Sequence, residues 1–157
     1  MTVNYFFVML ILFMHTNTRR YVSITIVTGV LLGIFTSLGQ TYSPDPFKQL
    51  ANSYSVWLLF SFATGYLIAS VRSAALAGIL VQYLAIVFYY LASLVRFDMT
   101  FTLGSLFSLN VIWLVGGTLV GPEAAVAGVY TKHRTRRYPI AIAFMAGLIF
   151  RKRYISL

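Results

Sequence analysis

The chain alternates long apolar stretches with short clusters of charged residues. Four stretches of 23 or 24 residues carry no Asp, Glu, Lys or Arg, and they lie between Arg20 and Asp45, Lys48 and Arg72, Arg72 and Arg96, and Asp98 and Glu123. A helix needs about 20 apolar residues to cross a hydrocarbon core about 30 Å thick. A membrane barrel would instead alternate polar and apolar residues in segments of about ten. The pattern therefore predicts an all-α, polytopic transmembrane helical bundle.

The four predicted spans lie near Tyr21–Gly39, Tyr54–Val71, Ala74–Leu94 and Leu103–Val120. The fourth helix is expected to continue through a kink at Gly121 and Pro122, because proline lacks the backbone N–H and bends or restarts a helix. Pro122 would then lie in the first turn of a segment over Glu123–Tyr130.

Both ends of the chain carry apolar segments that are too short to cross. Tyr5–Met14 is apolar over ten residues, and Met14 offers an alternative start, so we separate residues 1–18 as a short N-terminal segment. Tyr138–Phe150 has 13 residues before a basic cluster and would reach about 20 Å as a helix. Residues 138–157 are thus expected to form a re-entrant, interfacial or truncated last helix. We treat 1–157 as a single integral membrane domain.

Composition favours the same class. Hydrophobic residues make up 59% of the chain and charged residues 10%, against about 25% charged in soluble domains. A net charge of +9 would suggest a nucleic-acid partner for a soluble protein. Here the cations lie between apolar stretches, as they do at the cytoplasmic ends of spans, so the expected partner is the lipid bilayer and not nucleic acid.

The cations also predict the orientation. One side of the membrane receives seven of them, whereas the other receives Lys48 and Arg96 unless the last segment crosses. The larger group marks the cytoplasmic side and consists of Arg19, Arg20, Arg72, Lys132, Arg134, Arg136 and Arg137.

Two amide side chains, Gln82 and Asn110, lie within predicted spans. An unpaired amide in hydrocarbon costs several kcal/mol, so each must face protein or a cavity. One interpretation is an interhelical hydrogen bond, and the other is a ligand pocket lined by Gln82, Tyr83, Tyr90, Asn110 and Trp113. The seven-residue spacing of the two tyrosines places them on one helical face, which is more typical of packing.

Glu123 also has two interpretations. It is a carboxylate near the membrane interface, stabilised by the backbone dipole in a first helical turn, or it is a functional ionisable residue within the membrane.

The loop before the second span contains two prolines and is expected to begin as an extended turn. Phe47–Ser53 could then form one amphipathic turn at the membrane surface. Asn52 or Ser53 would cap the second helix, and Trp57 suits the interfacial aromatic belt.

Small residues four apart occur in every segment after the first and predict close helix packing. The pairs are Gly29/Gly33, Gly65/Ala69, Ala74/Gly78, Gly117/Gly121, Ala124/Gly128 and Ala143/Gly147.

Three stretches carry a family resemblance: "GVLLGIFTSLGQ" (29–40), "LANSYSVWLLFSFATGYL" (50–67) and "GPEAAVAG" (121–128). Together they resemble an uncharacterised family of small bacterial multi-spanning membrane proteins, classed as a domain of unknown function. The resemblance covers roughly residues 19 to 150. It implies a multi-pass protein of the bacterial inner membrane, without naming a substrate or a catalytic residue.

The hypothesis we favour is a small transport or ligand-binding membrane subunit. The alternative is a structural or assembly protein that stabilises a membrane complex, with another membrane protein or a second copy as partner. An enzyme is not expected, since the three acids and two histidines are scattered and form no catalytic or metal-binding motif. We expect no cofactor, and the ligand stays unknown.

The orientation can be tested by cysteine labelling, because the chain has no native cysteine. In intact cells a membrane-impermeant maleimide should label Ser43→Cys and spare Thr135→Cys until the membrane is opened, since seven cations oppose two. Ser156→Cys should be protected like Thr135→Cys, because three cations would have to follow a short segment across. The reverse pattern at the first two positions would overturn the orientation.

Overall fold

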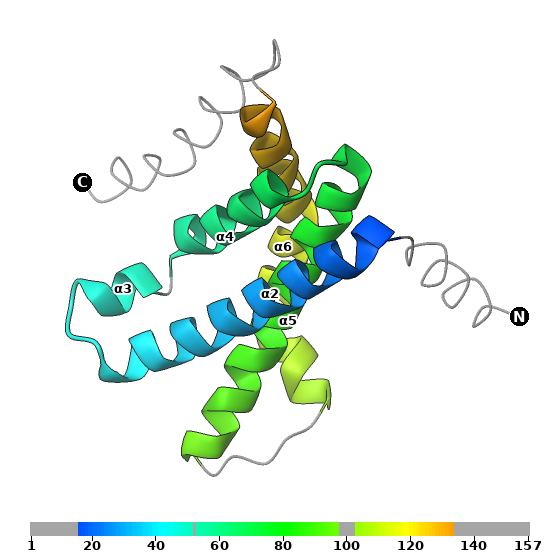
Figure 1. Ribbon diagram of the computed structural model, residues 1–157. Coiled ribbons are helices and arrows are strands. Elements are labelled where there is room, and N and C mark those ends of the chain that lie inside the picture. Colours follow the sequence, from blue (N-terminus) through cyan, green and yellow to red (C-terminus); the bar gives the residue numbers. More distant parts are fainter. Residues whose placement is uncertain (1–15, 52, 98–102, 134–157) are drawn as a thin grey trace, which may run out of the picture.

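The computed structural model describes residues 16–51, 53–97 and 103–133, and all regular structure in these ranges is helical. The all-α prediction is thereby confirmed for them. α5 lies at the centre of the bundle, in contact with α2, α4 and α6 (Figure 1). In chain order the elements are α2 (Thr16–Tyr42), α3 (Phe47–Ala51), α4 (Tyr54–Leu67), α5 (Val71–Phe97) and α6 (Leu103–Lys132).

Three of the described helices are long and apolar enough to cross a membrane. The apolar parts are Arg19–Tyr42 in α2, Val71–Val95 in α5 and Val111–Lys132 in α6, with 24, 25 and 22 residues. These lengths correspond to about 33–38 Å of helix, which exceeds a hydrocarbon core of about 30 Å. The chain thus has the helices of a membrane protein.

A full-length fourth span over Tyr54–Val71 is not confirmed. α4 has 14 residues and is about 21 Å long. It ends because Ile68 is extended, and the Ile68 N–H bonds back to the carbonyls of Thr64 and Gly65. α5 then begins at Val71, before the predicted start at Ala74. Ser70 caps it, because its hydroxyl accepts a hydrogen bond from the Ser73 N–H at 3.4 Å.

α6 continues through Pro122, as predicted, but no new helix starts there. It is one helix of 30 residues with Pro122 in its interior. Proline removes one backbone hydrogen bond, and the packing of neighbouring residues against α4 and α5 holds the helix together. Placing Pro122 and Glu123 in a first turn was therefore wrong, and so was the dipole interpretation of Glu123.

The connection from α2 to α4 follows the sequence pattern. Phe47–Ala51 is helical, with Phe47 and Leu50 exposed and Ala51 buried. Of the two predicted caps, Ser53 is the one described: its Oγ accepts a hydrogen bond from the Val56 N–H at 3.3 Å. Asn52 lies outside the described residues, as do the two terminal apolar segments and the cations at 134, 136 and 137.

The helices bury small and polar residues and expose large apolar ones. In α2, Leu31 and Phe35 are more than half exposed. A soluble helical bundle has the opposite distribution, whereas helices in lipid associate through small residues and interhelical hydrogen bonds. Among the residues whose burial the structure describes, the buried polar ones are Thr25, Thr36, Ser37, Ser53, Ser61, Thr64 and Gln82.

Helix backbones approach each other closely at glycine. A Cβ on Gly65 of α4 would overlap the Ala125 carbonyl of α6, and one on Gly78 of α5 would overlap the Gly121 carbonyl. Gly128 makes a second such approach to α4. α6 therefore lies against the backbones of both neighbours.

Most of the predicted small-residue pairs take part in such packing. Gly29 and Gly33 of α2 face α5. Ala69 does not, because it lies beyond the end of α4 and is exposed. The pair at 143 and 147 is outside the described residues.

Substituting Gly65 tests this packing. Gly65→Ala should lower the unfolding free energy by about 1–3 kcal/mol, because overpacking at a rigid contact costs that much. Gly39→Ala is the matched control, since its Cβ would meet only the Ala51 side chain, at 2.6 Å, on the short helix α3. Thermal unfolding in detergent measures both, and equal losses would contradict the backbone contact.

Candidate functional site

Gln82 connects three helices. Its side chain lies in α5 and is 2% exposed. The Nε2 group donates hydrogen bonds to the Trp57 carbonyl at 3.1 Å and to Ser61 Oγ at 2.8 Å, both in α4. Its Cβ and Cγ pack over Gly117 of α6. The interhelical hydrogen bond is thus present, and the amide is held at the point where α4, α5 and α6 meet.

An aromatic cluster forms between the first turn of α4 and the part of α6 around Trp113. The rings of Tyr54 and Trp113 are stacked, with centroids 5.2 Å apart and planes at 19°. Trp57 lies on the other side of the contact, 5.3 Å from Trp113 at 34°. The Tyr54 hydroxyl occupies the space that a Cβ on Gly116 would fill. Glycine at 116 therefore permits the phenol to enter the interface.

Three buried polar atoms beside this cluster have no hydrogen-bond partner: Trp57 Nε1, Tyr54 Oη and Thr36 Oγ1. Trp57 is 4% exposed and Thr36 fully buried. Thr36 lies one turn beyond Leu32 on the same face of α2, and Leu32 packs in the same cluster as Trp57. Buried polar groups nearly always have a hydrogen-bond partner. Three unpaired polar atoms near one another are therefore unusual, and they make this region the candidate site.

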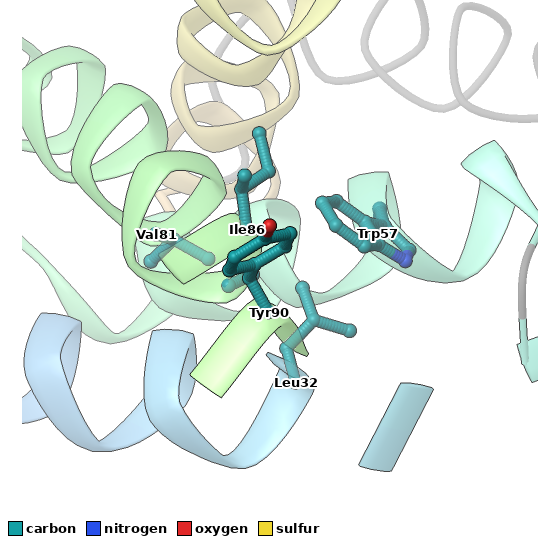
Figure 2. Packing of buried hydrophobic residues seen from close by; sticks show 6 residues of the cluster. Leu32, Trp57, Val81, Ile86 and Tyr90 are labelled. Atoms are coloured by element: carbon teal, nitrogen blue, oxygen red, sulfur yellow. The ribbon is translucent and has the colours of Figure 1, made fainter. Parts of the chain in front are cut away.

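Figure 2 shows how Trp57 is oriented. Its ring packs with Leu32, Ile86 and Tyr90, and the indole nitrogen lies on the edge that points away from Val81. Trp57 was expected in the interfacial belt, but it is buried inside the bundle. The sequence does contain a signal for this: Ser53, Trp57 and Ser61 recur every four residues, so one face of α4 carries all three.

The five predicted pocket residues are only partly brought together. Gln82, Tyr90 and Trp113 all lie around Trp57. Tyr83 does not, because its hydroxyl bonds Thr118 Oγ1 at 2.7 Å on the exposed α5–α6 surface. Asn110 belongs to α6, and its side chain is outside the described residues. Trp57 and Tyr54 are the two members that sequence analysis missed.

Acid–base groups do not gather in this region. Within 16–51, 53–97 and 103–133, no group of three or more His, Cys, Asp or Glu residues could hold a metal ion. Asp45 lies between α2 and α3, Glu123 is exposed in the C-terminal third of α6, and His133 follows the end of α6. The cluster consequently offers hydrogen-bond donors and aromatic faces.

The chain belongs to DUF6518, a family of unknown function, whose sequence profile matches residues 14–152. This confirms the resemblance to an uncharacterised domain family. No curated protein and no solved structure matches the chain.

The Gln82 hydrogen bonds can be tested by a double-mutant cycle. Gln82→Met keeps the volume over Gly117 and removes both hydrogen bonds, so we expect a loss of about 1.2 kcal/mol, twice the average for one such bond in membrane bundles. Ser61→Ala should cost less in the Gln82→Met background than in the wild type, because the two side chains bond each other. Unfolding in detergent measures the coupling, and strictly additive losses would contradict it.

Proposed function

We propose that this DUF6518 member is a small ligand-binding subunit of the bacterial inner membrane. The observation that supports it best is the group of buried donors without partners beside the Tyr54–Trp113–Trp57 cluster. Leaving a buried donor unpaired costs about 1–3 kcal/mol. A bound molecule that accepts these hydrogen bonds would remove that cost.

The donors define the chemistry of the ligand. An indole N–H only donates, so Trp57 requires an acceptor atom on the ligand. No charged side chain belongs to the described cluster, and stacked aromatic rings offer flat apolar faces. The proposed ligand is accordingly a small uncharged molecule with an apolar body and a carbonyl or hydroxyl oxygen.

Binding is proposed ahead of transport and catalysis. Secondary transporters use charged relays and pairs of broken helices in their spans, and the cluster includes neither. Catalysis is not part of the proposal, because the acids and histidines of the described region lie on separate elements.

A second candidate, a structural or assembly subunit, is favoured by a different observation. At the α4–α6 and α5–α6 interfaces, glycines allow the backbones of the two helices to touch. This contact gives a rigid bundle suited to holding a complex together. In that case the protein needs a partner and no ligand. With the orientation predicted from the cations, both candidates place the basic residues between 132 and 137 in the cytoplasm.

Substitutions of two aromatic residues in α4 test the ligand proposal. The protein is purified from its own membranes in mild detergent, and native mass spectrometry records the mass of any retained molecule. Tyr54→Phe removes one buried hydroxyl, and Trp57→Phe removes the indole N–H. We expect a retained small molecule in the wild type and at least a tenfold lower occupancy in both variants, since each loses a hydrogen bond worth about 1.4 kcal/mol or more.

Tyr66→Phe is the control, because Tyr66 lies on the same helix but is exposed. It should retain the molecule at the wild-type level. Without a ligand, Tyr54→Phe should unfold at the same temperature or higher, because an unpaired buried hydroxyl is removed. A wild type that retains nothing, or a molecule retained equally by all variants, would overturn the proposal.

A further inference from the structure

One end of the bundle brings together the start of α2, the link between α4 and α5, the start of α5 and the end of α6 (Figure 1). Buried Ile68, Ala74 and Val129 form one cluster there, and Tyr21 of α2 packs against it. The Ala69 N–H also donates a hydrogen bond to the Tyr21 hydroxyl oxygen at 3.4 Å. These contacts hold four chain segments together at what we call the Tyr21 end of the bundle.

Four exposed cations belong to the Tyr21 end. They come from three helices: Arg19 and Arg20 near the start of α2, Arg72 near the start of α5, and Lys132 at the end of α6. Lys48 lies in α3, beyond the opposite end of α2. The fold therefore gathers cations that are far apart in the sequence at one end of the molecule.

No acidic side chain of the described residues balances these charges. Asp45 lies beyond the opposite end of α2, and Glu123 is nine residues before Lys132, about 13 Å along α6. Within 16–51, 53–97 and 103–133, none of the four cations has an ion pair. Positive charges that gather without counter-charges repel one another and attract anions, so the Tyr21 end favours an anionic partner.

Two neutral hydroxyl groups lie beside the cations. The Tyr21 hydroxyl accepts from the Ala69 N–H, and Ser70 Oγ accepts from the Ser73 N–H, each at 3.4 Å. A hydroxyl that accepts one hydrogen bond still has its own proton to donate. Phosphate oxygens accept hydrogen bonds from guanidinium and hydroxyl groups, and bonds to charged groups are the stronger ones. The combination of donors suits a phosphate group.

The surroundings favour a phosphate that carries acyl chains over a soluble one. The apolar parts of α2 and α5 begin at Arg19 and Val71, which places the cations at the level of lipid headgroups. Leu67 and Val71 are 46% and 39% exposed, next to Ser70 and Arg72 in the chain. Acyl chains gain apolar contacts on such residues, whereas free phosphate gains none. Basic pockets between membrane helices bind anionic headgroups in this way.

We propose that the Tyr21 end is a binding site for an anionic phospholipid. Arg20, Arg72 and the hydroxyls of Tyr21 and Ser70 hold its phosphate, and its acyl chains lie along the exposed apolar residues below them. The bound lipid connects α2 to the start of α5. This inference goes beyond the proposed function and does not depend on it, because the ligand proposed there is uncharged and lies at the aromatic cluster.

Lipid binding in detergent tests the site without depending on the orientation in the membrane. The full-length protein is stripped of lipid and mixed with phosphatidylglycerol or phosphatidylethanolamine of the same acyl chains, and native mass spectrometry measures the affinity of each. We expect the wild type to bind phosphatidylglycerol at least tenfold more tightly. The double variant Arg20→Gln/Arg72→Gln should lower that affinity at least tenfold, because each cation near an anionic headgroup contributes about fivefold.

Lys48→Gln is the matched control, since it removes one cation beyond the opposite end of α2, and it should bind phosphatidylglycerol like the wild type. Without lipid, the double variant should unfold at the wild-type temperature, because both arginines are exposed and unpaired within the described ranges. Equal binding of the two lipids by the wild type, or an equal loss of affinity in Lys48→Gln, would overturn the proposal.

Soluble competitors distinguish a lipid site from a general phosphate site. Neither inorganic phosphate nor glycerophosphoglycerol, which is the headgroup without acyl chains, should displace the bound lipid, and displacement by either would contradict the lipid assignment. Tyr54→Phe should still bind phosphatidylglycerol, and Arg20→Gln/Arg72→Gln should leave the occupancy of the aromatic cluster unchanged. Failure of this proposal is thereby separate from failure of the ligand proposal.

Discussion

The backbones of α4, α5 and α6 touch at Gly65, Gly78 and Gly121, and the polar groups between these three helices are arranged around this approach. Lipid tails are as apolar as leucine, so moving a leucine side chain from lipid into a helix interface gains no hydrophobic free energy. Helices therefore associate where small residues permit dispersion contacts and hydrogen bonds. α6 supplies a face of glycine and alanine that fits against both neighbours at once. Its large apolar residues, such as Leu119, face outward.

The position of Gln82 follows from that approach. With a larger residue at 117, the amide could not pass between α5 and α6 to reach the Trp57 carbonyl and the Ser61 hydroxyl. The same closeness at Gly116 admits the Tyr54 phenol. Close packing thus produces two kinds of polar group in one place, an amide whose Nε2 group donates two hydrogen bonds and two unpaired donors. The unpaired donors have capacity left to bind an acceptor.

Charge spacing predicted the positions of α2 and α5 well, because a charged side chain is costly inside the membrane and therefore marks where spans end. It placed the end of the last described helix at Val120, whereas α6 continues through Glu123 to Lys132. The end of α4 could not be predicted in this way: the apolar stretch continues past Leu67, and only the capping hydroxyl of Ser70 separates two helices. Pro122 misled the analysis because the penalty for proline applies to an isolated helix, whereas packing holds this one. Trp57 suits both a membrane interface and a buried polar face, so composition alone did not distinguish them.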